Sequence, residues 1–193
     1  QAKKLSFIDN IVLSTDSKKI SNQFSKYGLN SFFLRSKKLS NSSSGKVPVI
    51  RDALYRSEKY YNKKYDYIID LDVTSPLRII KDIKAAYKKF IEDDADNLIT
   101  VCNAKKNPYF NMVEYNKNTL KLVKPTKKIL SRQAAPLVYE MNASIYIWKR
   151  KCLISSNNLF TKKTSMYIMP SDRSIDIDNN FDLKIVKYLM KKK

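Results

Sequence analysis

Residues 65–71, Tyr-Asp-Tyr-Ile-Ile-Asp-Leu, are followed by Asp72, by a helical pattern at 82–90 and by a second apolar run at 97–102. Both apolar runs are typical of buried strands, so this stretch predicts a strand–helix–strand unit of an α/β sheet. Ligands of open α/β sheets bind where the carboxyl ends of strands meet the following loops. Asp70 and Asp72 lie at such an end, which makes it the first candidate position for a site.

Strand and helix patterns also alternate before and after this stretch. Further strands are expected at 7–14, 31–34 and 166–169, and further helices between Ser17 and Gly28, at 49–60 and at 180–190. Residues 107–148 differ, because β-forming residues alternate there with polar interruptions, as in hairpins. At 193 residues we expect one domain over 1–193, with 107–148 as a β-rich arm within it.

The charge is strongly basic, at +20 with 38 Lys and Arg against 18 Asp and Glu. Because Lys is spread along the whole chain, we interpret this charge as a solvated surface that attracts small anions, and nucleic-acid binding stays an alternative. The chain contains no His, the commonest general base, so any chemistry must rest on carboxylates, Lys, Arg and metal.

Two cysteines, Cys102 and Cys152, are too few for a disulfide framework and are expected to be buried thiols in a reducing compartment. No stretch approaches the roughly 20 apolar residues of a membrane-spanning helix. With neither such a helix nor a secretory signal, we expect no membrane association and a cytoplasmic location.

Asp176-Ile177-Asp178 is a candidate metal site near the carboxyl end of the chain. On an extended strand the two carboxylates would share one face while Ile177 points into the core. Magnesium is usually held by one or two carboxylates together with nucleotide phosphates. A solvated turn or a helix cap is the alternative for such a short pattern.

Taken in order, several segments resemble the acylneuraminate cytidylyltransferases, which activate nine-carbon acidic sugars as CMP-sugars. The segments are Ile11–Ser17, Leu34-Arg35, Thr74–Arg78, Asn107–Met112, Arg132-Gln133, Asn142–Tyr146, Tyr167–Pro170 and Ser174–Asp178. The sequences Leu-Asp-Val-Thr-Ser-Pro-Leu-Arg and Asn-Pro-Tyr-Phe-Asn-Met resemble the branches that act on sugars such as legionaminic acid.

The resemblance implies an α/β fold like that of the nucleotide-diphospho-sugar transferases, with a mixed, mostly parallel sheet flanked by helices and a β-rich dimerisation arm. It further implies a homodimer in which each subunit lends its arm to the sugar site of its neighbour. In the family, the anomeric hydroxyl of the acidic sugar attacks the α-phosphate of CTP and displaces pyrophosphate with the assistance of Mg²⁺ or Mn²⁺.

The resemblance also assigns roles to individual residues. It implies that Asp176 and Asp178 bind metal and take part in catalysis, and that Arg132 takes part in catalysis and binds the sugar. The implied nucleotide-binding residues are Arg35, Lys46 and Asp72. The other implied sugar-binding residues are Gln133, Asn142, Tyr146 and Phe110. Asp72 stands where many members have Gln, so it is either a further metal-directed carboxylate or a cap of the turn that follows its strand. Lys46 either contacts phosphate or is a solvated loop lysine.

One departure concerns glycine. Family members carry a basic, glycine-rich loop whose backbone amides cradle the triphosphate, whereas this chain begins past that loop and its only glycines are Gly28 and Gly45. We therefore treat the domain as N-terminally incomplete and expect this polypeptide alone to bind CTP poorly and to turn over slowly or not at all. Beside the enzyme, a truncated and inactive family member and a basic nucleic-acid-binding protein stay open.

Overall fold

The computed structural model describes residues 1–29, 31–41, 43–126, 129 and 131–191. Its centre is a four-stranded sheet with the strand order β1-β5-β2-β6. The strands span Tyr67–Leu71 (β1), Asn97–Asn103 (β2), Tyr139–Lys149 (β5) and Thr164–Ile168 (β6). β5 is antiparallel to β1 and to β2, whereas β6 is parallel to β2. β1, β2 and β6 therefore share one direction, and the predicted mixed, mostly parallel sheet is confirmed.

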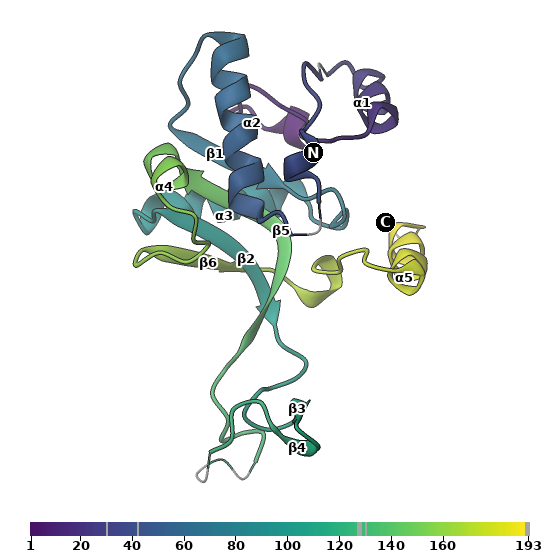
Figure 1. Ribbon diagram of the computed structural model, residues 1–193, viewed down its shortest axis with the longest axis vertical. Coiled ribbons are helices and arrows are strands. Elements are labelled where there is room, and N and C mark those ends of the chain that lie inside the picture. Colours follow the sequence, from purple (N-terminus) through teal and green to yellow (C-terminus); the bar gives the residue numbers. More distant parts are fainter. Residues whose placement is uncertain (30, 42, 127–128, 130, 192–193) are drawn as a thin grey trace.

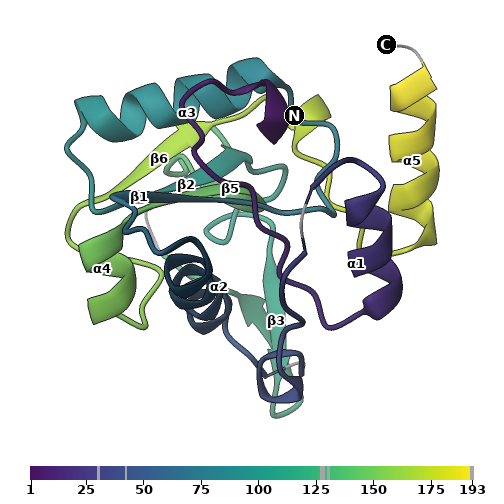
Figure 2. The ribbon, with the colours of Figure 1, turned by 90° about the horizontal axis from the view of Figure 1, so that it is seen from above.

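Helices cover both faces of this sheet (Figure 2). On one face, α3 (Ile80–Glu92) buries Phe90 and its neighbours against Ile145 and Ile147 of β5. On the other face, α2 (Lys46–Tyr61) and α4 (Arg150–Ser155) pack with Trp148. Alternate residues of β5 thus enter opposite cores, as the period of two of a strand requires. Both faces are covered, which is why the strand sequences are apolar runs.

The helices at 49–60 and 82–90 and the strands at 65–71, 97–102 and 166–169 are confirmed within a few residues. Helix α4 was not predicted, because its six residues are too few to show a helical period.

A two-stranded sheet lies between β2 and β5 in the sequence and apart from the central sheet in space (Figure 1). It consists of β3 (Val113–Asn116) and β4 (Thr119–Leu122), whose residues are almost all exposed. The base of this excursion is closed where Ala104 N donates to Val138 O over 3.2 Å. We call residues 104–138 the arm. The predicted boundary at 148 lies inside β5, because Ile145–Trp148 pairs with β1 and β2 in the core.

Among the described residues of the first forty, the regular elements are short helices: η1 (Ala2–Lys4), α1 (Lys18–Ser25) and η2 (Lys37–Leu39). Helix α1 is confirmed: Ser17 Oγ caps its start by accepting from Ile20 N, and Gly28, beyond its end, has a φ of +69°. The strands expected at 7–14 and 31–34 are wrong. Neither segment pairs with β1 in the described residues, and an apolar run without a neighbouring strand forms no ladder.

The carboxyl-terminal part continues from β6 through η3 (Ser171–Arg173) and an irregular segment to α5 (Asn180–Lys191). Helix α5 is confirmed. Among its apolar side chains, Val186 is buried whereas Phe181 is 69% exposed. Asp176-Ile177-Asp178 lies in the irregular segment, so the strand geometry expected for the two carboxylates is wrong.

Both cysteines are free and buried, as predicted. No helix in the described ranges combines the length and the apolar character needed to cross a membrane.

Candidate functional site

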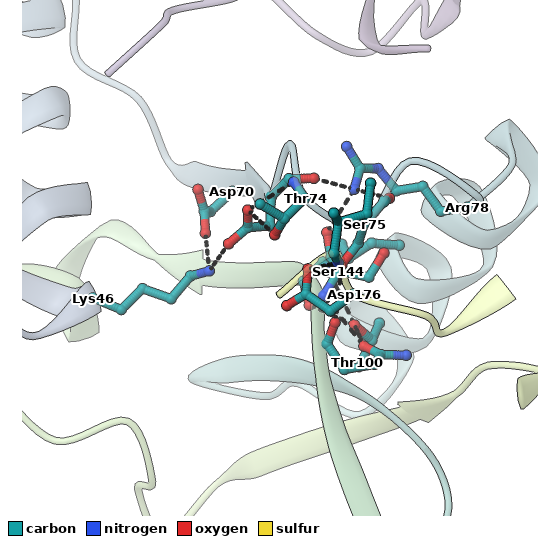
Figure 3. Close-up of polar contacts among 12 residues, drawn as sticks. Lys46, Asp70, Thr74, Ser75, Arg78, Thr100, Ser144 and Asp176 are labelled. Carbon is teal, nitrogen blue, oxygen red and sulfur yellow. Dashed lines mark hydrogen bonds and ion pairs between the residues drawn. The ribbon is translucent and has the colours of Figure 1, made fainter. Parts of the chain in front are cut away.

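Two carboxylates and one ammonium meet at the carboxyl end of β1 (Figure 3). Lys46, the first residue of α2, places its Nζ 2.9 Å from Asp72 Oδ2 and 3.1 Å from Asp70 Oδ2. The same ammonium lies 4.4 Å from the centre of the Tyr146 ring. Lys46 is therefore an internal counter-ion of this strand end, and the solvated loop lysine considered from the sequence is not what the structure shows.

These contacts set the charge states of the cluster. Burial lowers the pKa of Lys46, but the charges and hydrogen bonds of Asp70 and Asp72 outweigh it and hold that pKa above its ordinary value. Burial raises the pKa of Asp70, and the neighbouring Lys46 only partly opposes it. For Asp72, burial also raises the pKa, but Lys46 and Thr74 prevail and lower it. Asp72 is thus the firmly ionised carboxylate of the pair.

Asp72 also builds the turn that follows β1. Its Oδ1 accepts from Thr74 Oγ1 over 2.9 Å and from Thr74 N over 3.2 Å. Its carbonyl accepts from Arg78, whose buried guanidinium also donates to Ser75 O over 2.8 Å. Of the two roles left open from the sequence, capping of the turn is the one observed. Arg78 was quoted only as part of a motif, and its structural role was missed because the motif does not reveal its carbonyl partners.

Asp176 reaches this strand end from the other end of the chain. Ser75 Oγ lies 3.5 Å from Asp176 Oδ1, and Ile177 N donates to Thr74 O over 3.0 Å. Asp178 behaves differently: its side chain is exposed, and its backbone N–H donates to Asp182 Oδ2 at the start of α5. The structure therefore brings Asp176, but not the side chain of Asp178, to the cluster.

The donor set at Asp176 suits a hard divalent cation better than that at Asp70 and Asp72. Asp176 is half-buried and forms no ion pair with the residues that the structure describes, whereas Asp70 and Asp72 are already paired with Lys46. No group of three or more Asp, Glu, Cys or His in the described ranges is arranged to hold a metal. A magnesium ion here would rely on one or two carboxylates and on nucleotide phosphates, which is its usual mode.

Two of the predicted sugar-binding residues are internal. Asn142 is 4% exposed: its Oδ1 accepts from Thr100 Oγ1, and its Nδ2 donates to Ser174 Oγ. Tyr146 is 3% exposed beneath Lys46, and burial raises its pKa. In this arrangement both side chains contact the protein itself, and their contact with a sugar stays a prediction.

The other three predicted sugar-site residues, Phe110, Arg132 and Gln133, lie in the arm, which extends away from the sheet (Figure 1). Arg132 is exposed and donates to Lys105 O over 3.1 Å. Within one chain these residues do not join the carboxylate cluster, so their role depends on a second subunit and stays a prediction.

Arg35, predicted to line the nucleotide pocket, is held beside the loop that leads to α2. Its backbone N donates to Thr15 O over 2.7 Å, and its Nε donates to Ser40 Oγ over 3.1 Å. The guanidinium lies 3.8 Å from Asp16. Its contact with a nucleotide is untested by this geometry.

A separate hollow runs along the outer edge of β6, lined by Lys89, Asp93 and Tyr167 among others. Its carboxylate, Asp93, is paired with Lys89 at 2.9 Å. The strand end with Asp72 and Asp176 is therefore the better candidate, because it gathers charged groups from three separate parts of the chain: Lys46, the neighbouring Asp70 and Asp72, and Asp176.

Comparison with known proteins decides the family. The family model described as Cytidylyltransferase matches residues 1–192. The chain belongs to the cytidylyltransferase family. It is a nucleotidyltransferase, and the resemblance inferred from the sequence is confirmed at the level of the family.

Two relatives come from Campylobacter. The chain is 43% identical over 194 residues to post-translational flagellin modification protein B of Campylobacter coli, covering 100% of this chain and 82% of that protein. It is 44% identical over 191 residues to CMP-N,N'-diacetyllegionaminic acid synthase of Campylobacter jejuni, covering 98% of this chain and 80% of that protein.

The fold of this cytidylyltransferase is also found in a solved structure. CMP:2-keto-3-deoxy-manno-octonic acid synthetase complexed with CTP superimposes with a TM-score of 0.66 at 13% identity, covering 99% of this chain and 84% of the other. At such identity the likeness supports the fold alone.

Proposed function

We propose that this cytidylyltransferase transfers CMP from CTP to an acidic nine-carbon sugar and releases pyrophosphate. The observation that carries the proposal is the position of Asp176, which is free of any cation in the described chain and lies beside Ser75 at the carboxyl end of β1. The 44% identity to a CMP-N,N'-diacetyllegionaminic acid synthase supports a legionaminic-acid-like sugar as the acceptor.

In this proposal, Asp176 and Asp178 would hold Mg²⁺ or Mn²⁺ together with the phosphates of CTP. A divalent ion there would neutralise charge on the α-phosphate and lower the pKa of the attacking hydroxyl. The exposed side chain of Asp178 would have to turn toward the cluster to take part.

The chain's own residues would bind and orient the two substrates. Lys46 and Asp72 lie where the nucleotide would meet the strand end, and Arg35 flanks the loop before α2. The anomeric oxygen forms a bond to the α-phosphorus, the bond to the pyrophosphate oxygen breaks, and the hydroxyl proton is lost. Since the chain has no His, that proton would pass to a carboxylate or to water.

The arm supports a homodimer as part of the proposal. Arg132 and Gln133 are exposed on a segment that extends beyond the sheet, where they could reach a neighbouring subunit (Figure 1). A guanidinium offers paired donors to the carboxylate of an acidic sugar. Use of CTP further suggests a cytoplasmic location.

The direct test is formation of a CMP-sugar by the purified chain. CTP, Mg²⁺ and either N,N'-diacetyllegionaminic acid or N-acetylneuraminic acid are incubated with the protein, and products are measured by mass spectrometry. We expect Mg²⁺-dependent formation with a preference for the legionaminic acid, to whose synthase the chain is 44% identical. Absence of product with both sugars would contradict the proposal for this polypeptide.

A second candidate is a non-catalytic member of the family that keeps the fold and the arm. It is favoured by the pairing of Asp70 and Asp72 with Lys46, which already supplies these two carboxylates with a counter-ion. CTP binding measured by calorimetry, together with the assay of CMP-sugar formation, separates the two candidates. A non-catalytic member would form no CMP-sugar whether or not it binds CTP. Only bulk charge favours nucleic-acid binding, which a steep salt dependence of that binding would reveal.

A further inference from the structure

Arg173 and the buried Asp82 form a two-point ion pair that joins the start of α3 to the segment preceding Asp176. Arg173 Nε donates to Asp82 Oδ2 over 2.9 Å, and Arg173 Nη2 donates to Asp82 Oδ1 over 2.8 Å. The Asp82 side chain is 1% exposed. Two parallel hydrogen bonds fix the guanidinium in orientation as well as in distance.

Asp82 is itself held in place. Its Oδ2 accepts from Ile79 N over 2.9 Å, so it caps the first turn of α3. That helix packs against the central sheet through Ile83 and Phe90, which are both fully buried. The pair therefore attaches the side chain of Arg173 to a helix that is firmly packed against the sheet.

A second attachment follows one residue later. Ser174 Oγ accepts from Asn142 Nδ2 over 2.9 Å and donates to Pro170 O over 2.9 Å. The amide of Asn142 is fixed in turn by Thr100 Oγ1, which donates to its Oδ1 over 2.7 Å. The segment is thus joined to β2 and β5 as well as to α3.

Asp176 lies between these attachments and a third one. On its far side, Ile177 N donates both to Thr74 O and to Asp176 Oδ1, each over 3.0 Å. Asp178 follows the last attachment, and its side chain is exposed. The difference between the two aspartates thus coincides with the limits of the held segment.

We propose that Arg173 is a positioning residue, which acts through Asp82 to keep the carboxylate of Asp176 at the strand end where the metal–nucleotide complex binds. This inference rests on the proposed function, because that complex belongs to it. Arg173 contacts no substrate in this account, and its effect passes entirely through the backbone of residues 174–177.

The test uses Arg173→Ala and Arg173→Lys in the full 193-residue chain. Mn²⁺ binding in the presence of CTP is followed by electron paramagnetic resonance, and hydrogen exchange of the peptide over residues 174–178 by mass spectrometry. We expect Arg173→Ala to weaken Mn²⁺ binding about 10-fold or more, as loss of an outer-shell contact to a metal ligand does, and to speed exchange in that peptide. Arg173→Lys keeps the positive charge but not the two parallel hydrogen bonds of the guanidinium, so it should retain part of the Mn²⁺ affinity.

Arg56→Ala is the matched control, because Arg56 also pairs with an aspartate, Asp52 at 2.8 Å, but on the exposed surface of α2. It should leave both readouts unchanged. Wild-type Mn²⁺ affinity in both Arg173 variants would overturn the inference while leaving the proposed function intact. Failure of the wild-type chain itself to bind Mn²⁺ with CTP would instead contradict the proposed function, and this inference with it.

Discussion

The carboxyl end of the sheet and the arm differ in how far their side chains are covered by their own chain. At the sheet end, polar side chains are at least half-buried and hydrogen-bonded within the chain: Lys46 donates to Asp72, and Asn142 accepts from Thr100. In the arm, Tyr115 is 71% exposed and Leu120 is 65% exposed. The first region is organised by its own chain, whereas the second presents apolar surface that its own chain does not cover.

This difference indicates which parts are complete in one subunit. Polar groups that are already hydrogen-bonded are held ready for a ligand without further ordering. Exposed apolar side chains gathered on one hairpin are typical of a surface that meets another protein. The account therefore assigns the chemistry to the sheet end and the contact with a partner to the arm.

The largest expected effect lies at the sheet end. Asp176→Asn removes a charge placed to hold the metal, and we expect CMP-sugar formation to fall by at least about 100-fold, the loss typical of one electrostatic contact to a transition state. Asp172→Asn, an exposed aspartate of η3, is the control and should keep wild-type activity. Equal activity of the two variants would show that the carboxylate at the sheet end takes no part in the reaction.

The ion pair at the amino-terminal end of β1, opposite the candidate site, should be the next most sensitive. Glu58 in α2 is 4% exposed and pairs with Arg150 Nε at 2.6 Å and Lys64 at 2.8 Å. We expect Glu58→Gln to lower the free energy of unfolding by about 2 kcal/mol, less than a fully buried pair because Arg150 and Lys64 keep access to water. Urea unfolding measures this, with the exposed Glu92→Gln as control.

The same pair predicts a pH dependence. Hydrogen bonding to Arg150, against the opposing effect of burial, lowers the pKa of Glu58 from 4.5 to about 2. A lowered pKa in the folded state gives stability that is fully present above the ordinary value and is lost as the pH falls through the folded value. The difference in stability between wild type and Glu58→Gln should therefore shrink between pH 4.5 and pH 2. A constant difference over that range would show that the ion pair is not its source.

In the arm, Arg132→Ala tests whether this region serves a second subunit. We expect kcat/KM for the sugar to fall about 10-fold, or about 1.4 kcal/mol, with no change in unfolding, because the side chain of Arg132 is exposed and its hydrogen bond goes to Lys105 O within the arm. Lys121→Ala in β4 is the control. An unchanged kcat/KM would separate the arm from the sugar site.

The smallest effect should come from Tyr115→Ala in β3. A side chain that is 71% exposed contributes little to folding of one subunit, so we expect a change within about 0.5 kcal/mol at low protein concentration. Phe90 of α3 is 0% exposed in the core between that helix and the sheet, so Phe90→Ala should lower the free energy of unfolding by about 3 to 5 kcal/mol. Similar losses of unfolding free energy in the two variants would show that the arm is as tightly packed as the core, contrary to this account.

Much of the central fold was predictable because its signals are local. The apolar runs at 65–71 and 97–102 become buried strands, and the pattern at 82–90 becomes α3. The strands expected at 7–14 and 31–34 failed, because an apolar run does not reveal whether a neighbouring strand is available for pairing.

The site was predictable only in part. Asp72 was found because it follows a strand, and Asp176 because of its motif. The contacts that hold them were not, since Lys46 lies 26 residues from Asp72 and Arg173 lies 91 residues from Asp82. No local pattern encodes such pairs, and an alternation of aspartates does not show that only Asp176 is held against the sheet.

The most direct test of the account is a crystal grown with CTP and Mn²⁺, in which anomalous scattering locates the metal. We predict a manganese peak within roughly 2.2 Å of a carboxylate oxygen of Asp176, with CTP phosphates completing its coordination. A peak bound elsewhere, with Asp176 left free beside Ser75, would contradict the central claim.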